Sequence, residues 1–144
     1  MLSFFNMKQK NMNIHYNEAS KALNASIEKA NELNIPVTIA VVDTGGHLMA
    51  LARLDSVYGV IDFAIKKAKT AIMFGVDNDS MGKIVEGAGV HGYGMINSND
   101  GLFTVGGGVL IKNKEENIIG AIGSSGGTPE QDQEIAAAGA TALV

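Results

Sequence analysis

The chain has 144 residues, no cysteine, a formal net charge of -4 and a hydrophobic share of 46%. Without cysteine it has no disulfide, thiolate zinc site, iron–sulfur cluster or cysteine nucleophile, and the composition fits a reducing cytoplasm, where we expect the protein to act. Lysine and arginine are scattered apart from Lys66, Lys67 and Lys69, which argues against a nucleic-acid surface. No apolar run approaches the ~18–20 residues of a membrane span.

We expect a flexible leader over residues 1–13 and a single domain over residues 14–144. Leu2, Phe4 and Phe5 are apolar, but polar residues follow them at once. A secretory signal instead needs basic residues and then ~7–15 apolar ones. The remaining length is usual for one domain, and no internal repeat or linker divides it.

The first half of the chain predicts a helix, a hairpin and a second helix. Small apolar residues recur at three- and four-residue spacing over 16–33, which is typical of an amphipathic helix. Pro36 ends it. Residues 37–42 and 48–53 predict two strands, because both runs are apolar and turn residues separate them. A second amphipathic helix is expected over 60–74.

The second half predicts strands and a closing helix. Residues 77–99 are polar and glycine-rich, with one short helix expected at 80–86. Short connections separate three apolar runs, which predicts antiparallel pairing; these runs are 102–105, 109–112 and 118–124. We therefore expect an α+β fold with a five-stranded antiparallel sheet and flanking helices.

The last helix has the clearest start signal in the chain. Thr128 suits the N-cap, Pro129 suits the first helical position, and Gln131 completes a capping box. The preceding Ser125, Gly126 and Gly127 leave two interpretations open. The first is simple capping. The second is a nest of N–H groups that binds a carboxylate or a propionate.

The run Gly106-Gly107-Gly108 also has two interpretations. No Lys-Ser/Thr follows it, so it is not the phosphate loop of nucleotide hydrolases. The glycines either make a tight connection between strands or let the backbone approach a ligand closely.

Three histidines are present, and their spacing matches no metal motif such as HExxH. For each of them a surface or structural role is the plain interpretation. His47 follows a hairpin turn, where we expect it to be solvated. His15 at a helix start and His91 in the glycine-rich segment are candidate ligands for a metal or a haem iron.

Lys67 is the most informative charged residue. Helical geometry places it one turn from Ala64 and Ala71, near the buried stripe of its helix. A half-buried lysine can bind an acid or act as a base, whereas a solvated helix surface is the alternative. Ser124 and Ser125 lack the GxSxG elbow, which argues against a serine hydrolase.

Several segments, taken together in their order, resemble the GlcG-like family, whose members include HbpS-type haem-binding proteins and the C-terminal domain of PduO-type proteins. The resemblance runs from about residue 14 to the end, and its segments are Val41-Val42-Asp43 with Gly45-Gly46, Arg53-Leu54-Asp55, Ala64 to Lys67-Ala68 with Thr70-Ala71, Gly107-Gly108-Val109, Gly120 to Gly123 with Ser125-Gly126-Gly127, Glu130-Gln131-Asp132, and Ile135-Ala136.

The resemblance implies a profilin-like or PAS-like sheet and dimers that often assemble further. It also associates the chain with haem binding or with catabolic operons for glycolate and diols. The sequence departs from the family pattern at Leu110, where proline is usual, at Lys69, where an aromatic is frequent, and at His15, where Thr or Ser is frequent. These departures leave the ligand open.

We therefore carry three hypotheses. The first is a small-ligand-binding protein whose cofactor or ligand is haem or a small carboxylic acid, and which forms a homo-oligomer through its alanine-rich last helix. The second is an enzyme that uses Lys67, Asp132 or a histidine for proton transfer, and the third is a structural accessory subunit. The absence of a nucleophile, base and orienter motif favours binding. The expected ligand-binding residues, predicted to meet in one cleft, are Lys67, Gly107, Gly108, Ser125, Gly126, Thr128 and Asp132.

Overall fold

The computed structural model describes residues 12–144, so the leader predicted over 1–13 lies almost wholly outside the described residues. Its helices are α2 (Tyr16–Leu33), α3 (Gly59–Phe74), α4 (Asn78–Gly87), α5 (Val90–Ile96) and α6 (Pro129–Ala140), with a 3-10 turn η1 (Ser98–Asp100). The strands are β1 (Thr38–Asp43), β2 (Leu48–Arg53), β3 (Gly108–Lys112) and β4 (Ile118–Ser125).

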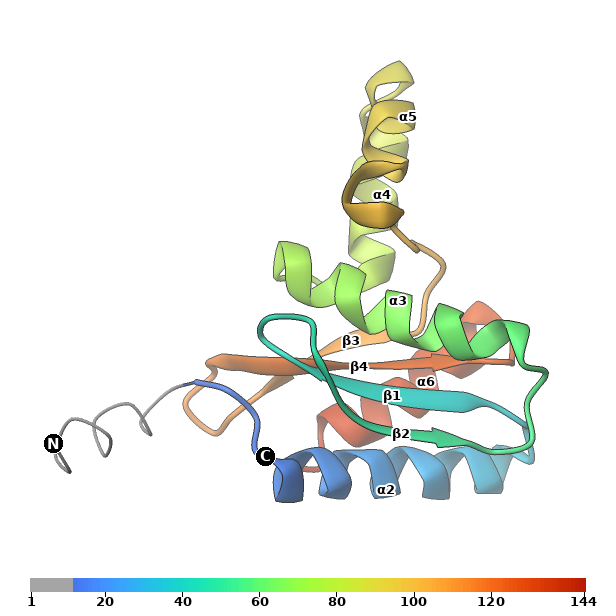
Figure 1. Ribbon diagram of the computed structural model, residues 1–144, viewed down its shortest axis with the longest axis vertical. Coiled ribbons are helices and arrows are strands. Elements are labelled where there is room, and N and C mark those ends of the chain that lie inside the picture. Colours follow the sequence, from blue (N-terminus) through green and yellow to red (C-terminus); the bar gives the residue numbers. More distant parts are fainter. Residues whose placement is uncertain (1–11) are drawn as a thin grey trace, which may run out of the picture.

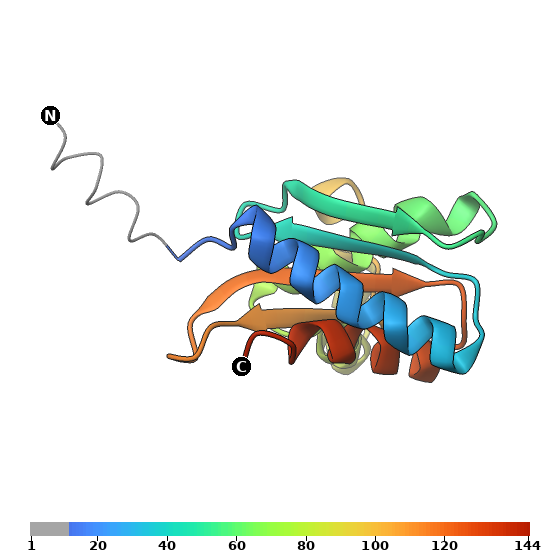
Figure 2. The same ribbon diagram turned by 90° about the horizontal axis from the view of Figure 1, so that it is seen from below.

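The four strands form one antiparallel sheet in the order β2-β1-β4-β3. Helix α3 covers one face, while α2 and α6 pack together on the other (Figures 1 and 2). The α+β class with flanking helices is therefore confirmed, but the sheet has four strands and not five. Among the described helices none is long and apolar enough to cross a membrane.

The sheet buries side chains on both faces. Strand β1 is the clearest case, because its β-branched and small residues from Thr38 to Val42 are fully buried. On the α3 face the packing uses small residues, and Gly123 lies so close to the carbonyl oxygen of Ala64 that a side chain there would collide with the helix backbone. The larger cluster lies on the α2 and α6 face, around Ile39, Ile122 and Ile135.

The strand predicted over 102–105 does not form. The Phe103 N–H donates to Thr70 Oγ1 at 3.0 Å, and the Asn78 side-chain amide donates to the carbonyls of Phe103 (2.9 Å) and Val105 (2.7 Å). Because side chains from α3 and α4 satisfy these backbone groups, the segment needs no strand partner. Its apolar residues misled the prediction.

The segment 77–99, predicted to be irregular with one short helix, instead forms two helices. The predicted helix at 80–86 lies within α4, and α5 follows after a tight turn. Helix α5 contains Gly92 and Gly94 among its seven residues, and glycine disfavours a helix interior by ~1 kcal/mol, so its composition concealed it. The pair α4–α5, which we call the arm (residues 78–96), stands away from the sheet (Figure 1).

The last helix begins as predicted, and its small residues pack closely against α2. Ala136 and Ala140 are buried in the core, and Gly139 lies against Ser26 and the carbonyl of Ala22 on α2. These small residues of α6 therefore allow close packing within the chain, and a role of this helix in an oligomer stays a prediction.

Candidate functional site

An ion pair between Lys67 and Asp132 joins the two helical layers. Lys67 is on α3 and Asp132 on α6, which lie on opposite faces of the sheet, and their side chains meet where β3 begins. Lys67 Nζ lies 2.9 Å from Asp132 Oδ2. Lys67 is only 1% exposed and Asp132 only 2%, so both charged groups are withdrawn from water.

Gly107 makes room for this ion pair. A Cβ atom at this position would lie 2.9 Å from Lys67 Nζ and 2.9 Å from Asp132 Cβ. The backbone φ of +133° is also one that residues with side chains rarely adopt. Gly107 therefore leaves the space that the Lys67 side chain occupies, and the close approach to a ligand considered from the sequence stays a prediction.

The ammonium of Lys67 is well supplied with partners. Besides Asp132 it donates to the carbonyl oxygen of Ser124 at 2.9 Å, and it lies 5.8 Å from the centre of the Phe103 ring. Burial lowers the pKa of Lys67, while the hydrogen bond and the charge of Asp132 act in the opposite direction. Removal of either partner would leave a buried charge uncompensated.

The start of α6 is closed by its own side chains. Thr128 Oγ1 accepts from the Gln131 N–H at 3.2 Å and Gln131 Oε1 accepts from the Thr128 N–H at 2.9 Å, which confirms the capping box. Asp132 Oδ1 accepts from the Gly127 N–H at 2.9 Å. Two N–H groups of the predicted anion nest, those of Gly127 and Thr128, are thus engaged within the chain, and anion binding there stays a prediction.

The predicted ligand residues are brought together only in part. Lys67, Gly107 and Asp132 are in contact, and Gly108 lies against the backbone of Lys67. Ser125 is buried on β4, and Gly126 packs against the carbonyl of Pro36. Thr128 is exposed at the helix start. A role of these seven residues in binding a ligand stays a prediction.

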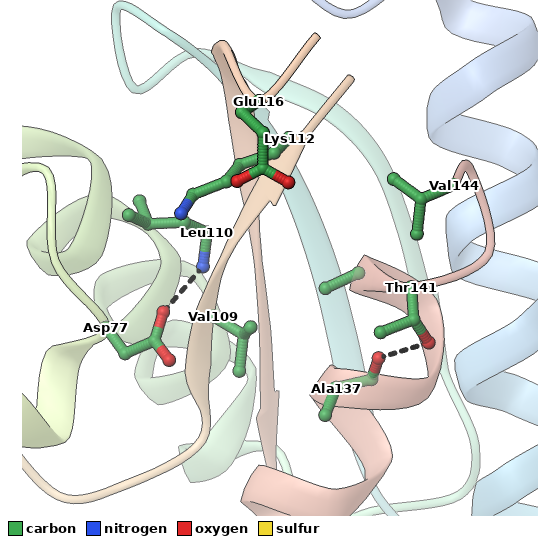
Figure 3. Close-up of a pocket in the computed structure, with 9 residues that line it drawn as sticks. Asp77, Val109, Leu110, Lys112, Glu116, Ala137, Thr141 and Val144 are labelled. Carbon is green, nitrogen blue, oxygen red and sulfur yellow. Dashed lines mark hydrogen bonds between the residues drawn. The ribbon is translucent and has the colours of Figure 1, made fainter. Parts of the chain in front are cut away.

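A groove that the sequence did not indicate runs along strand β3, the edge of the sheet. Figure 3 shows its apolar floor at Val109 and Leu110, with Asp77 on one side and α6 on the other. The groove has a volume of about 330 Å³. Asp77 Oδ1 accepts from the Leu110 N–H at 3.0 Å, a contact drawn in Figure 3. No local pattern reveals this groove, because its walls are far apart in the chain.

The three histidines lie on different elements. His15 caps α2, where its backbone N–H donates to Glu18 Oε1 at 2.9 Å. His47 follows the β1–β2 turn with 80% of its side chain exposed, as expected. His91 is exposed on the arm. In residues 12–144 no cluster of three or more His, Cys, Asp or Glu side chains is placed to hold a metal ion.

His47 has an oriented ring. Its Nδ1 lies 3.1 Å from Asp43 Oδ1, which also accepts from the backbone N–H groups of His47 and Gly45 at 2.9 Å each. Burial acts to raise the pKa of Asp43, but these hydrogen bonds outweigh it and the pKa lies below its usual value. The ring therefore turns its Nε2 away from the carboxylate. The spacing Asp43-Thr44-Gly45-Gly46-His47 is the signal that sequence reasoning missed.

Similar proteins agree on one family. A protein of Citrobacter freundii, described as an uncharacterized 15.0 kDa protein in the dhaT-dhaS intergenic region, is 35% identical over 82% of this chain and 84% of its own. The crystal structure of the PduOC:heme complex matches with a TM-score of 0.79 and 28% identity, over 91% of this chain and 95% of that one. A double mutant of HbpS from Streptomyces reticuli matches with a TM-score of 0.83 and 26% identity, over 94% and 90%. The family described as "Haem degrading protein HbpS-like" matches residues 14–141, and the chain belongs to this HbpS-like family.

Proposed function

We propose that this protein is a cytoplasmic haem-binding protein. The observation that carries the proposal is the likeness to the PduOC:heme complex, which extends over nine-tenths of both chains at 28% identity. The HbpS-like family description supports the same ligand. When bound, haem supplies an iron whose reactivity depends on its axial ligand and on the surrounding pocket.

The chain offers suitable iron ligands. Neutral imidazole is a common axial ligand of haem iron, and no cysteine competes with it in this sequence. His15, His47 and His91 all have exposed positions. These residues therefore fit the donor set that haem requires.

His47 has the strongest claim among the three. A ligating histidine usually bonds its second ring nitrogen to a carboxylate or carbonyl, and Asp43 already occupies that position at 3.1 Å. His15 lies at the same end of the sheet, because the neighbouring Asn13 side chain accepts from the Thr44 N–H at 2.8 Å. His91 is on α5, at the end of the arm that lies away from the sheet, whereas His15 and His47 lie beside the sheet (Figure 1).

Haem titration of the purified chain tests the proposal. We expect a Soret band that saturates at a fixed ratio of haem to protein. Three alanine variants, His15→Ala, His47→Ala and His91→Ala, are compared, and we expect His47→Ala to shift the band most. The variant Asp43→Asn keeps the imidazole and should give a smaller shift. A band that never saturates and that none of the three alanine variants alters would show adsorption to the surface, and haem binding would be rejected.

A small carboxylic acid is the alternative ligand that the sequence predicts. In the described geometry the Lys67 ammonium is already paired with Asp132, so such a ligand must displace that carboxylate. If it does, Lys67→Met should weaken its binding by roughly 1–3 kcal/mol, the usual size of a charge-assisted hydrogen bond. Unchanged affinity in calorimetry would limit Lys67 to a structural role.

We also propose that the chain forms a homo-oligomer. Fifteen large apolar side chains are exposed in residues 12–144, several of them on the arm. Closed symmetric homo-oligomers are the usual way in which soluble proteins cover such surfaces.

A further inference from the structure

Two hydrogen-bond donors on opposite sides of the β3 groove are already occupied. The Leu110 N–H donates to Asp77 Oδ1 at 3.0 Å. The hydroxyl of Thr141 donates to the carbonyl of Ala137, also at 3.0 Å, and Figure 3 draws both contacts. A small molecule that enters the groove therefore cannot bond to these donors and has to supply donors of its own.

The acceptors beside these donors remain open. Asp77 is the N-cap residue of α4, but its side chain does not cap the helix, and within residues 12–144 its carboxylate bonds only to the Leu110 N–H. Asp77 Oδ2 is thus free to accept. A residue in an antiparallel ladder directs its N–H and its C=O to the same side, so the carbonyl of Leu110 points outward together with its N–H. Thr141 Oγ1 also keeps its lone pairs.

The charges of the groove favour a cation. Two acidic residues, Asp77 and Glu116, and one basic residue, Lys112, line it, so the lining is negative as a whole. Lys112 and Glu116 both lie at the upper end of the groove in Figure 3, where their charges cancel. Asp77 lies lower, at the side of β3, and it is half-buried. Water and salt therefore screen its charge less than that of a fully exposed carboxylate.

We propose that the groove binds a small primary amine in its protonated form. An ammonium group has three N–H donors and no acceptor, which matches a site that offers acceptors. It donates to Asp77 Oδ2 and to the carbonyl of Leu110. A short alkyl chain then covers the apolar part of the lining, which consists of Val109, Ala137 and Ala140. The volume of about 330 Å³ suits a ligand of this size. This inference does not depend on haem binding, which we assign to other residues.

Three probes with the same alkyl chain test the ligand class. Titrations of the purified chain at neutral pH, followed by the shifts of its amide signals in nuclear magnetic resonance spectra, compare n-butylammonium chloride, n-butanol and sodium butyrate. We expect saturable binding of butylammonium and none of butyrate. Butanol should bind at least about tenfold more weakly than butylammonium, because its donor carries no charge. No saturable binding of butylammonium, or equal affinity for butylammonium and butyrate, would overturn the proposal.

A matched pair of substitutions tests the role of Asp77. Asp77→Asn removes the charge but keeps an oxygen that can accept from the Leu110 N–H. We expect it to weaken butylammonium binding at least about tenfold, since a charge-assisted hydrogen bond becomes a neutral one. Asp79→Asn makes the same change on α4 outside the groove lining, and it should alter the affinity by no more than about twofold. Equal losses in the two variants would overturn the assignment.

The wild-type titration covers the case in which Asp77→Asn does not fold. Butylammonium in the groove should shift the amide signals of Leu110 and Thr141, which lie on its two sides. The amide signal of His47, in the β1–β2 turn, should stay in place and is the internal control. Saturable shifts that spare Leu110 and Thr141 would place the amine elsewhere and would overturn the groove as its site.

Discussion

The body of this protein and its arm differ in what they bury. In the body a lysine and an aspartate are buried 2.9 Å apart, with small apolar residues covered on every side. In the arm Lys83 and Glu86 are exposed, and so are Val90 and Tyr93. The body therefore has a packed interior that can hold a buried charge pair, whereas the two short helices of the arm have little interior of their own.

The largest effect on stability should come from breaking the buried ion pair. Asp132→Ala leaves the Lys67 ammonium without its carboxylate, and removal of one partner from a buried pair costs about 3–5 kcal/mol. Urea unfolding followed by circular dichroism measures this loss. Glu130→Ala is the control because Glu130 lies exposed in the same first turn of α6, and its loss should cost no more than about 1 kcal/mol. Similar losses in both variants would contradict the role assigned to Asp132.

A smaller loss of stability is expected when Gly107, just before β3, is given a side chain. Gly107→Ala sets a methyl group 2.6 Å from the carbonyl oxygen of Ser124 and 2.9 Å from both Lys67 Nζ and Asp132 Cβ, at a backbone φ of +133°. Strain of this kind costs roughly 1–3 kcal/mol. Gly94→Ala is the matched control, since nothing lies within 4 Å of its position in α5. That variant should be neutral or up to about 1 kcal/mol more stable. Thermal unfolding of the two variants decides, and equal melting temperatures would contradict the prediction.

The smallest effect concerns pH. Burial lowers the pKa of Lys67 below its ordinary 10.5 in the folded chain. Between the folded-state pKa and 10.5, the unfolded chain holds a proton that the folded chain has released, so this group makes the free energy of unfolding rise with pH. Below that window both states hold the proton and the contribution is constant. Relative to Lys67→Met, the wild type should gain stability as pH rises toward 10.5, and a pH-independent difference would refute this.

Sequence patterns predicted the elements whose contacts are local. Helix α2, the β1–β2 hairpin and the start of α6 follow from spacing, turn residues and a capping box, and all three form. The apolar run 102–105 failed as a strand because its backbone partners are the side chains of Thr70 and Asn78. Local apolarity carries no information on such distant partners.

The site was predictable to a similar degree. Helical spacing placed Lys67 near the buried stripe, and the structure buries it completely. Its pairing with Asp132 joins residues 65 positions apart. The two side chains can meet only because Gly107, which has no side chain, lies between them. Local spacing does not show such a contact. By contrast, the contact of Asp43 with His47 spans only four residues, so attention to turn geometry would have revealed it.

Two neighbouring side chains restrict which edge of the sheet can accept a further strand from another molecule. Asp77 accepts from the Leu110 N–H at 3.0 Å and Asn78 accepts from the Gly108 N–H at 2.8 Å, which are donors on the outer margin of β3. An incoming β-strand from another molecule finds these donors occupied, so fibril-like stacking onto that margin is blocked. Any strand exchange or amyloid-type addition must therefore begin at the opposite margin, on β2. Engineers who fuse a strand-forming tag to this protein should expect trouble from β2 and not from β3.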